Sequence, residues 1–318
     1  MSVLENIKES ISASNTIAIL THDNPDGDAV GSSLAMMHSL RKIGKKVDVI
    51  IPSLNKMYEI LPGYEEIKHQ IGKEDNYDLC IALDSADMER LGACKEIFEK
   101  TKNTMVIDHH ITNQNFGDVN YVNAVASSTC QNLIVIIGYL DIAINKDIAT
   151  CLYTGILTDT GGFRYNVQVE TFEIAAMLLE TGVDIAKIYR NFFDLTTLSR
   201  TKAIGKAIER LEILSNGKIA FTYITEEDEE KFELTDGDHE GIVNYGRDIE
   251  NVEVSVFIRQ KENKYKVSLR ANEYVDVSLI ASKFGGGGHM RAAGLSSDMS
   301  FDLLKQSIIA EIEKQLRI

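Results

Sequence analysis

Histidine and aspartate side chains follow three apolar, β-branched segments of the sequence, at the point where each segment ends. They are His22, Asp26 and Asp28 after residues 16–21, Asp84 after residues 79–83, and Asp108, His109 and His110 after residues 104–107. One aspartate in such a place is commonly a helix cap, and a lone histidine is more often an ordinary polar group. Three examples in succession are hard to attribute to capping, because carboxylates gathered in one place repel one another. We therefore expect a cation to hold these side chains together.

A further aspartate, Asp159, ends a helical pattern just before Gly161 and Gly162, which by itself is typical of a helix stop. Histidine and aspartate ligands without cysteine suit an octahedral, oxygen-preferring ion, with Mn²⁺ first and Mg²⁺ or Co²⁺ behind it. The set is too large for one ion. Two ions about 3.5–4 Å apart, bridged by a carboxylate and a hydroxide, are the usual apparatus for in-line attack on phosphorus. The residues thus point to phosphoester hydrolysis.

The segments that must position these residues alternate between two patterns. Strand-like runs occupy residues 16–21, 47–51, 79–83 and 104–107, and helical patterns occupy residues 28–43, 86–100 and 128–140. This alternation predicts the α/β class, with a mostly parallel sheet flanked by helices. Parallel strands end at the same edge of a sheet, and ligands bind at their carboxyl ends. The candidate residues should therefore converge on one rim.

The last third of the chain starts a second pattern of strands, which predicts a separate, smaller α/β domain. Its strands are expected at residues 218–223, 252–259 and 265–270, with a hairpin turn at Glu262 and Asn263 and a closing helix at residues 301–316. A length of 318 residues is about twice that of a typical domain. We expect a catalytic metal-binding domain at residues 1–190, a helical linker at 191–212 and a substrate-binding domain at 213–318.

The charge balance limits the class of ligand. The chain has 33 Lys and Arg against 48 Asp and Glu, a net charge of −15, which disfavours long DNA or RNA as the main ligand. Small anions remain compatible with a cleft that bound metal ions make positive.

No apolar run is long enough for a bilayer, and Glu5 and Lys8 stand where a signal peptide would be apolar. We expect a cytoplasmic protein with no membrane association and with reduced, mostly buried cysteines.

A glycine run at residues 285–288 precedes His289 and Arg291. Consecutive glycines let backbone N–H groups approach a phosphate closely, and His289 and Arg291 add charged donors, although such a run is also typical of a flexible loop. Residues 252–294, which include Arg270, carry seven Lys or Arg and four Asp or Glu. This locally basic segment suits a short phosphate-bearing ligand better than a long polymer.

Taken together, these motifs resemble those of the DHH phosphoesterase superfamily. The matching residues are His22-x-x-x-Asp26-x-Asp28, Asp84, Asp108-His109-His110 and Asp159, in this order, and residues 285–288 with His289 and Arg291 are similar to the glycine-rich motif of the DHHA1 domain. The motifs extend from residue 22 to residue 291. The two-domain layout is most similar to the bacterial nanoRNase and pAp phosphatase group, because RecJ-type exonucleases normally carry further domains.

The resemblance implies a role for each matching position. His22, Asp26 and Asp84 would hold the first metal ion, and Asp28, Asp84, His109 and Asp159 would hold the second, which makes Asp84 the bridge. Asp84 and His110 would be catalytic, with His110 facing the phosphate, and Asp108 would orient the adjacent histidines. The substrate would contact Arg270, Gly286, Gly287, Gly288, His289 and Arg291.

The activity implied is metal-dependent hydrolysis of short oligoribonucleotides to mononucleotides, and of 3′-phosphoadenosine 5′-phosphate (pAp) to AMP and phosphate. The alternative is a phosphodiesterase for cyclic-di-AMP or its linear product pApA, which would use the same metals. A non-catalytic nucleotide sensor is disfavoured, because a retired site has no need for so many mutually repelling acids. A pyrophosphatase of the same superfamily is disfavoured by the basic, glycine-rich second domain. A homodimer is left open.

Overall fold

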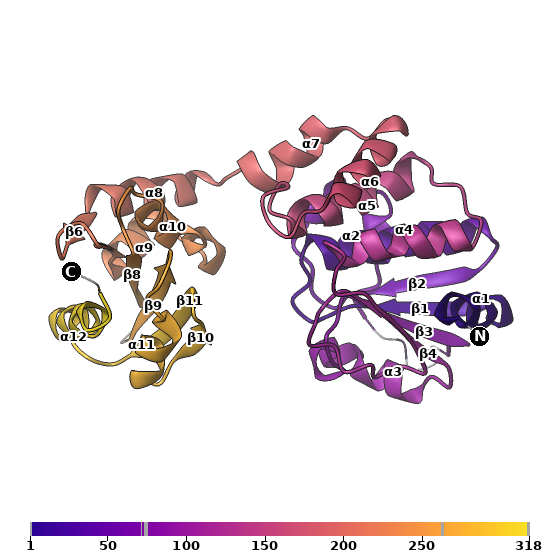
Figure 1. The fold of residues 1–318 in the computed structure, drawn as a ribbon, viewed down its shortest axis with the longest axis horizontal. Helices are drawn as coiled ribbons and strands as arrows, with labels where there is room; N and C mark the ends of the chain where they lie inside the picture. The colour runs from indigo at the N-terminus through magenta and orange to yellow at the C-terminus, as the bar shows by residue number, and fades with distance from the viewer. Residues whose placement is uncertain (1, 71, 73–75, 262–263, 317–318) are drawn as a thin grey trace. The chain divides into compact units, whose positions relative to one another are not determined.

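The computed structural model describes residues 2–70, 72, 76–261 and 264–316, and the chain forms two compact units, Met1–Leu195 and Thr196–Ile318 (Figure 1). The segment predicted as a linker contains the π-helical turn η4 (Arg190–Asp194) and helix α8 (Leu198–Glu209). Helix α8 packs against strand β7 (Ile219–Ile224), so it is part of the second unit. Among the described residues, no helix combines the length and apolar character that a membrane span needs.

A parallel sheet forms the centre of the first unit, as the alternating pattern predicts. Within the described residues its strands lie in the order β2-β1-β3-β4-β5, and they are β1 (Thr16–Leu20), β2 (Lys46–Ile50), β3 (Leu79–Leu83), β4 (Thr104–Asp108) and β5 (Val119–Val122). Leu20 pairs with Ala82, and Leu83 pairs with Ile107. This register brings the carboxyl ends of β1, β3 and β4 side by side, so the residues after them share one rim.

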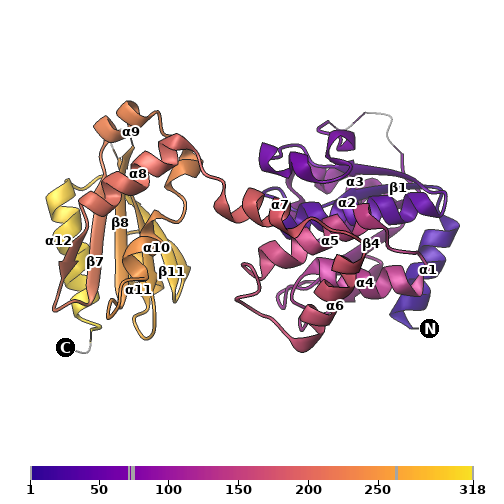
Figure 2. The same cartoon turned by 90° about the horizontal axis from the view of Figure 1, so that it is seen from above.

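Helices cover both faces of this sheet (Figure 2). The helices of the first unit are α1 (Val3–Ala13), α2 (Gly27–Lys42), α3 (Lys95–Lys100), α4 (Thr129–Tyr139), α5 (Lys146–Asp159), α6 (Val169–Glu180) and α7 (Ile185–Tyr189), with 3₁₀ turns η1 (Lys56–Ile60), η2 (Tyr64–Glu66) and η3 (Glu89–Cys94). Strand β1 is buried on both of its faces. Its alternate residues Ile17 and Ile19 belong to the core that includes α2, α4 and α5, whereas Ala18 and Leu20 pack with η3 and α3.

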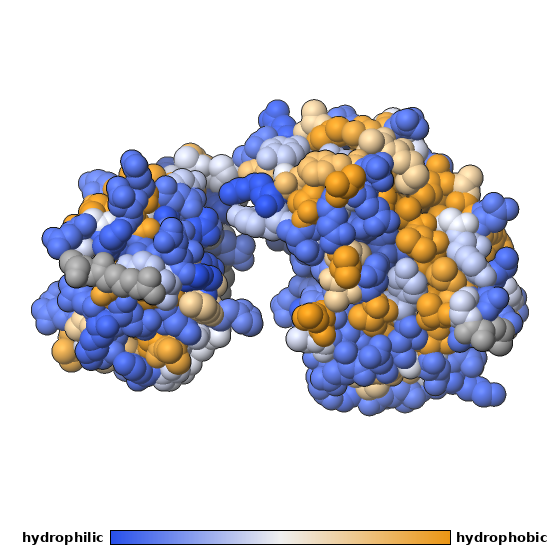
Figure 3. Space-filling view, viewed as in Figure 1, coloured by the Kyte–Doolittle hydropathy of each residue, from blue (hydrophilic) through white to orange (hydrophobic). Residues whose placement is uncertain are grey.

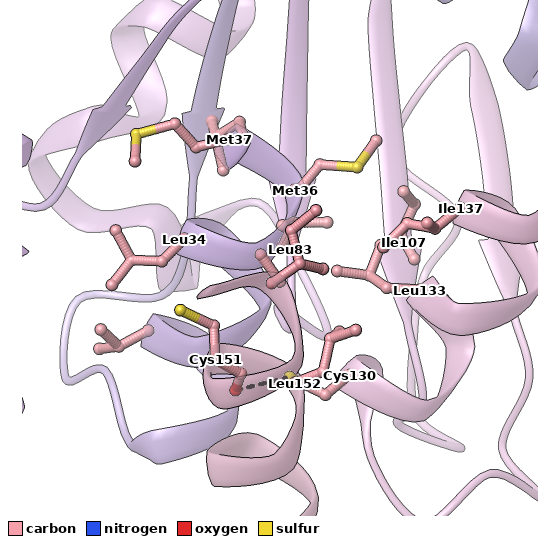
Figure 4. Packing of buried hydrophobic residues seen from close by; sticks show 14 of the residues in the cluster. Leu34, Met36, Met37, Leu83, Ile107, Cys130, Leu133, Ile137, Cys151 and Leu152 are labelled. Atoms are coloured by element: carbon pink, nitrogen blue, oxygen red, sulfur yellow. Dashed lines mark hydrogen bonds between the residues drawn. The ribbon is translucent and has the colours of Figure 1, made fainter. Parts of the chain in front are cut away.

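The larger core joins α2, α4 and α5 to the sheet. Figure 4 shows Met36 of α2 and Leu133 of α4 beside Leu83 of β3, at the centre of this packing. The thiol of Cys130 on α4 reaches to 4.0 Å from the carbonyl oxygen of Cys151 on α5. All four cysteines are buried free thiols, as the sequence predicts. The helix predicted at residues 86–100 is instead broken into η3 and α3, because Gly92 takes a non-helical backbone conformation (φ 53°, ψ −125°).

The second unit contains a mixed sheet. Within the described residues the strand order is β10-β11-β9-β8-β7-β6, and the further strands are β6 (Glu212–Leu214), β8 (Val254–Lys261), β9 (Lys264–Ala271), β10 (Gly287–His289) and β11 (Ala292–Ser297). Its further helices are α9 (Glu226–Phe232), η5 (Asp236–His239), α10 (Ile242–Arg247), α11 (Val277–Lys283) and α12 (Phe301–Glu313). Strands β8 and β9 are antiparallel, as expected for a hairpin, while the predicted turn residues Glu262 and Asn263 lie outside the described residues.

Candidate metal centre

The predicted metal ligands lie together at the carboxyl edge of the first sheet. Their donor atoms form three groups, each within 4.8 Å: His22, Asp26 and Asp84; Asp28, His109 and Asp159; and Asp84, His109 and His110. The Nε2 atom of His109 lies 3.6 Å from Oδ1 of Asp84 and 3.6 Å from Oδ2 of Asp159. The Nε2 atom of His22 lies 3.9 Å from Oδ2 of Asp84. Asp84 therefore stands between the two sets of donors.

Local structure fixes each carboxylate. Asp26 caps α2, and its Oδ1 atom accepts hydrogen bonds from the backbone N–H groups of Asp28 (3.0 Å) and Ala29 (3.1 Å). Asp84 follows β3 with a left-handed backbone (φ 55°), a conformation that aspartate tolerates better than most residues. Asp159 is the last residue of α5, where Gly161 (φ 58°) and Gly162 (φ 75°) turn the chain away.

Close contact between helices α2 and α5 brings Asp28 towards Asp159. A Cβ atom added to Gly27 would come 2.2 Å from the hydroxyl of Thr158, and one added to Gly155 would come 2.7 Å from Oδ1 of Asp28. Glycine at both positions therefore permits an approach that a methyl group would block. Asp28 of α2 and Asp159 of α5 therefore belong to one donor group, although they are more than a hundred residues apart in the chain.

The carboxylates of the site are buried close to one another, so a bound cation would stabilise their ionised forms. Asp28 and Asp84 are 1% and 2% exposed. Burial, and then the charges of the other aspartates, raise the pKa of Asp84 well above its usual range. Burial likewise raises the pKa of Asp28, and it raises the pKa of Asp159 to about 7. Such groups are stabilised as anions when a positive ion lies between them.

The donor set fits divalent metal ions. Burial lowers the pKa of His22, which favours the neutral imidazole that can act as a ligand. Its Nδ1 atom is buried and has no hydrogen-bond partner in the described part of the chain. Carboxylates combined with neutral imidazoles and without a thiolate are the ligands of oxygen-preferring metals such as manganese.

Asp108 lies behind the histidines and is fully buried. Its Oδ1 atom accepts a hydrogen bond from the backbone N–H of His109 (2.8 Å), and its Oδ2 atom accepts one from Nδ2 of Asn113 (2.6 Å). Burial opposes ionisation of Asp108, but hydrogen bonds from His110 and Asn113 outweigh it and lower the pKa of Asp108. The hydrogen bond to Asp108 raises the pKa of His110. This arrangement orients His110 and favours its protonated form.

Three residues that contact or influence the site are not among those predicted from the sequence. The backbone N–H groups of Thr129 and Cys130, at the start of α4, donate to the carboxylate of Asp28 (2.6 and 2.9 Å), and the hydroxyl of Thr129 donates to Asp84 (3.0 Å). The third is Arg90. Burial lowers the pKa of His22, and the positive charge of Arg90 acts in the same direction, so Arg90 lies within electrostatic reach. Its position six residues after Asp84, in an acidic stretch, was an available signal.

The candidate substrate residues lie in the second unit. Ala292 of β11 pairs with Arg270 on one side and with His289 on the other, so Arg270 and His289 stand in one row across the sheet. The glycine run forms part of β10, where a Cβ atom on Gly288 would come 2.5 Å from the carbonyl oxygen of Ala292. A Cβ atom on Gly286 would come 2.3 Å from the carbonyl oxygen of Gly294. Gly287 and Arg291 also belong to this hairpin, Gly287 in β10 and Arg291 in its turn. The lack of a side chain at Gly286 and Gly288 thus allows close strand pairing, and it also leaves their backbone at least partly exposed.

Comparison with known proteins agrees with this geometry. Residues 16–156 match the N-terminal domain of the DHH family, and residues 216–317 match the DHHA1 domain. The chain is 32% identical to the bifunctional oligoribonuclease and PAP phosphatase of Thermus thermophilus, over 94% of this chain and 90% of that protein. It is 26% identical to the cyclic-di-AMP phosphodiesterase of Listeria monocytogenes, over 98% of this chain and 48% of that protein.

A solved structure matches the chain across both units. The crystal structure of an exopolyphosphatase-related protein from Bacteroides fragilis superposes with a TM-score of 0.87 at 29% identity, covering 98% of this chain and 96% of that one. The matched segments contain each of the strand-end motifs up to Asp108-His109-His110 and the glycine-rich hairpin. The chain therefore belongs to the DHH phosphoesterase family and carries the DHHA1 domain of that family after its DHH domain.

Proposed function

We propose that this protein is a metal-dependent phosphoesterase that hydrolyses very short oligoribonucleotides to mononucleotides, and pAp to AMP and phosphate. The observation that carries the proposal is the convergence of histidine and aspartate donors on Asp84, in a chain similar over most of its length to a bifunctional oligoribonuclease and PAP phosphatase. Asp26, Asp28, Asp84 and Asp159 are spread over neighbouring donor groups, and carboxylates placed so close together are costly to keep as anions unless they bind metal.

Two divalent ions, with Mn²⁺ as our first choice and Mg²⁺ or Co²⁺ behind it, are the cofactors that we propose. His22, Asp26 and Asp84, which form one donor group, would hold one ion. Asp28, His109 and Asp159, which form another, would hold the second ion together with Asp84, whose Oδ1 atom lies 3.6 Å from Nε2 of His109. Bound ions of this kind supply a nucleophilic water at neutral pH and neutralise charge on the phosphate. The backbone N–H groups of Thr129 and Cys130 keep the carboxylate of Asp28 in place for this task.

His110 is the proposed proton donor. Its Nδ1 atom lies 2.7 Å from Oδ1 of Asp108, and this contact leaves Nε2 to face the phosphate or the leaving oxygen. Asp108 acts through His110 and does not touch the substrate. Arg90 adds a fixed positive charge that favours an anionic ligand near the two histidines.

The second unit would bind the nucleotide through Arg270, the Gly286–Gly288 backbone, His289 and Arg291. A net charge of −15 opposes a long polyanion, which agrees with a preference for very short substrates. We also propose that the protein acts in the cytoplasm. Fractionation of cells that carry a tagged copy would test this location.

One assay tests the activity. The purified protein with Mn²⁺ is incubated with a labelled RNA dimer, a 20-nucleotide RNA, pAp and cyclic-di-AMP, and the initial rates are compared. The dimer and pAp should be cleaved fastest, and EDTA should abolish every rate. No turnover of the dimer or of pAp with any of the three metals would refute the proposal.

A phosphodiesterase for cyclic-di-AMP or pApA is the second candidate, favoured by the 26% identity to the Listeria monocytogenes enzyme. Rapid cleavage of the cyclic dinucleotide alone in the same assay would select it. The match covers only 48% of that enzyme, so this candidate has the weaker support.

Self-association as a homodimer stays a proposal. The surface seen in Figure 3 has hydrophobic residues gathered on the first unit. Helix α6 exposes Val169 (76%), Phe172 (55%) and Met177 (41%). Sedimentation of the wild type and of Phe172→Glu would show whether this helix joins two copies.

A further inference from the structure

Two aromatic rings of the first unit, those of Tyr189 and Phe193, have no part in the function proposed above. Tyr189 ends α7, and Phe193 lies four residues later in the turn η4. Their ring centroids are 4.8 Å apart, and the ring planes are inclined by 24°. Tyr189 is 41% exposed and Phe193 is 39% exposed. The two residues, called the aromatic pair below, therefore form a stack that keeps much of its surface in solvent.

The aromatic pair lies against the turn that follows Asp159. A Cβ atom built on Gly162 would come 3.5 Å from the ring of Tyr189 and 3.9 Å from the ring of Phe193. Gly162 comes three residues after Asp159, which is a candidate metal ligand. The backbone N–H of Gly162 donates to the carbonyl oxygen of Leu157 (2.8 Å), so this turn is held close to the end of α5. The aromatic pair is therefore a neighbour of the metal centre.

A second set of contacts joins the same helical turn to the loop before α2. The ring of Phe192, which lies between the two members of the aromatic pair in sequence, is 5.7 Å from the ring of Tyr58. The hydroxyl of Tyr58 donates to the carbonyl oxygen of Pro25 (3.4 Å), the residue before the candidate ligand Asp26. The turn is thus connected to the segments that carry Asp26 and Asp159, which belong to different donor groups.

The aromatic pair is not needed for the core of the first unit. Within the described residues that core includes Ile188 of α7, which is 2% exposed, and it has Phe192 packed against it, but neither ring of the pair belongs to it. The rings are carried instead at the start of a π-helical turn, a form of helix that is rare and frequent at functional sites. An exposed aromatic stack beside a reactive centre is typical of a surface that meets a ligand.

A nucleobase is the ligand that suits this position. Every base has a flat π face, and proteins that bind single-stranded nucleic acid stack bases on exposed tyrosine and phenylalanine rings. The phosphate that reacts would lie at the metal ions, and one sugar joins it to its base. The aromatic pair is continuous with the metal centre, so a base of the bound nucleotide can reach it.

We infer that Tyr189 and Phe193 form a stacking platform for a nucleobase of the substrate, next to the phosphate that is cleaved. The inference rests on the proposed function and adds a specificity determinant to it: phosphoesters that carry an aromatic base are preferred over phosphoesters of the same charge without one. Stacking of this kind holds the bound substrate and its transition state equally, so it should lower KM and leave kcat nearly unchanged.

Fluorescence tests the platform without catalysis. The chain has no tryptophan, so Phe193→Trp supplies a single reporter at this position. In Mg²⁺, AMP should quench its fluorescence by stacking, whereas ribose 5-phosphate, which has the same phosphate and no base, should not. Tyr139→Trp, at the end of α4, is the matched control and should respond to neither ligand. No response of Phe193→Trp to AMP, or an equal response to both ligands, would overturn the inference.

Kinetics with pAp and with an abasic analogue of pAp separates a contact with the base from a structural role. The wild type should have a KM for pAp at least about fivefold below that for the analogue. Tyr189→Leu and Phe193→Leu should raise the KM for pAp and leave that for the analogue unchanged. Tyr189→Phe, which keeps a ring, should retain the preference, and so should Tyr139→Leu. A variant that only loosened the fold would change both substrates alike.

The outcomes distinguish this inference from the proposed function. A wild type that hydrolyses pAp and the abasic analogue with equal KM would refute the platform and keep the function. A wild type that hydrolyses neither would refute the function, and the fluorescence titration would still decide whether a base binds here. Sedimentation covers the other occupant, a second copy of this chain. A dimer that dissociates in Phe193→Leu, with an unchanged preference for pAp, would assign the rings to self-association and overturn the inference.

Discussion

The carboxylate of Asp108 lies 2.7 Å from Nδ1 of His110, and this contact raises the pKa of the histidine while it lowers the pKa of the aspartate. Each group therefore stabilises the charged form of the other. The pair supplies an oriented proton donor next to the group of metal ligands.

Replacement of Asp108 by Asn should lower the pKa of His110, because the hydrogen bond that His110 donates to a carboxylate is lost. We expect kcat to fall on the order of 10²-fold. The alkaline limb of the pH–rate profile should move to lower pH, since the proton leaves His110 earlier. An unchanged limb in Asp108→Asn would show that Asp108 has only a structural role.

Asp84→Asn should abolish turnover and weaken Mn²⁺ binding, because Asp84 belongs to two of the three donor groups. In EDTA the same variant should melt at a higher temperature than the wild type, since it removes a buried carboxylate that others repel. Thermal melts with and without Mn²⁺ measure both effects. Asp298→Asn, which changes an exposed aspartate of the second unit, is the control and should change neither. Near-normal activity of Asp84→Asn with added Mn²⁺ would refute the bridging role.

The metal-free protein should lose stability as pH rises from about 4 to 7. The pKa of Asp159 is about 7 in the folded chain, above its usual value of 3.8, so the folded state binds more protons than the unfolded state in this window. Stability that depends on the protonated form is present at low pH and is lost as pH passes the folded pKa. Melting temperatures in EDTA should show this slope. Asp159→Asn should reduce it without abolishing it, because burial also raises the pKa values of Asp28 and Asp84. Saturating Mn²⁺ should reverse the slope, because the metal competes with the proton.

Gly155→Ala should destabilise the first unit by about 1–3 kcal/mol through overpacking. Its new Cβ atom would come 2.3 Å from Sγ of Cys130 and 2.7 Å from Oδ1 of Asp28. Mn²⁺ affinity should fall with stability, because the variant displaces a ligand. Gly138→Ala on α4 is a matched control, since its Cβ atom would meet nothing within 4 Å. Equal melting temperatures for the two variants would contradict the packing argument.

The buried thiols should react slowly. Burial raises the pKa of Cys94 to about 11, and Cys80, Cys130 and Cys151 are also buried, with raised pKa values. Few thiolates therefore exist at pH 8, and reagent access is restricted. A thiol reagent should label the native chain far more slowly than the chain in urea. Fast labelling of one cysteine in the native protein would identify a mobile segment.

The strand-end aspartates and histidines could be read from the sequence, because apolar runs followed by acids fix both the strands and their common edge. Strand β5 could not, since its four residues are only half-buried and show no apolar run. The helix predicted at residues 86–100 was wrong, because the left-handed Gly92 interrupts a sequence that otherwise has helical periodicity. The contacts of Thr129 and Cys130 with Asp28 join residues about a hundred positions apart, and no local pattern reports such a contact.

The left-handed backbone at Asp84 limits how the site can be redesigned. Aspartate and asparagine accept that conformation because their short side chains bond to the nearby backbone, whereas a longer acid gains no such compensation. Replacement of Asp84 by Glu, made to change which size of ion the site prefers, would therefore strain the backbone at this position before it altered the coordination of the ion. Engineering of ion selectivity is better directed at Asp26 or Asp159, which occupy the ends of helices.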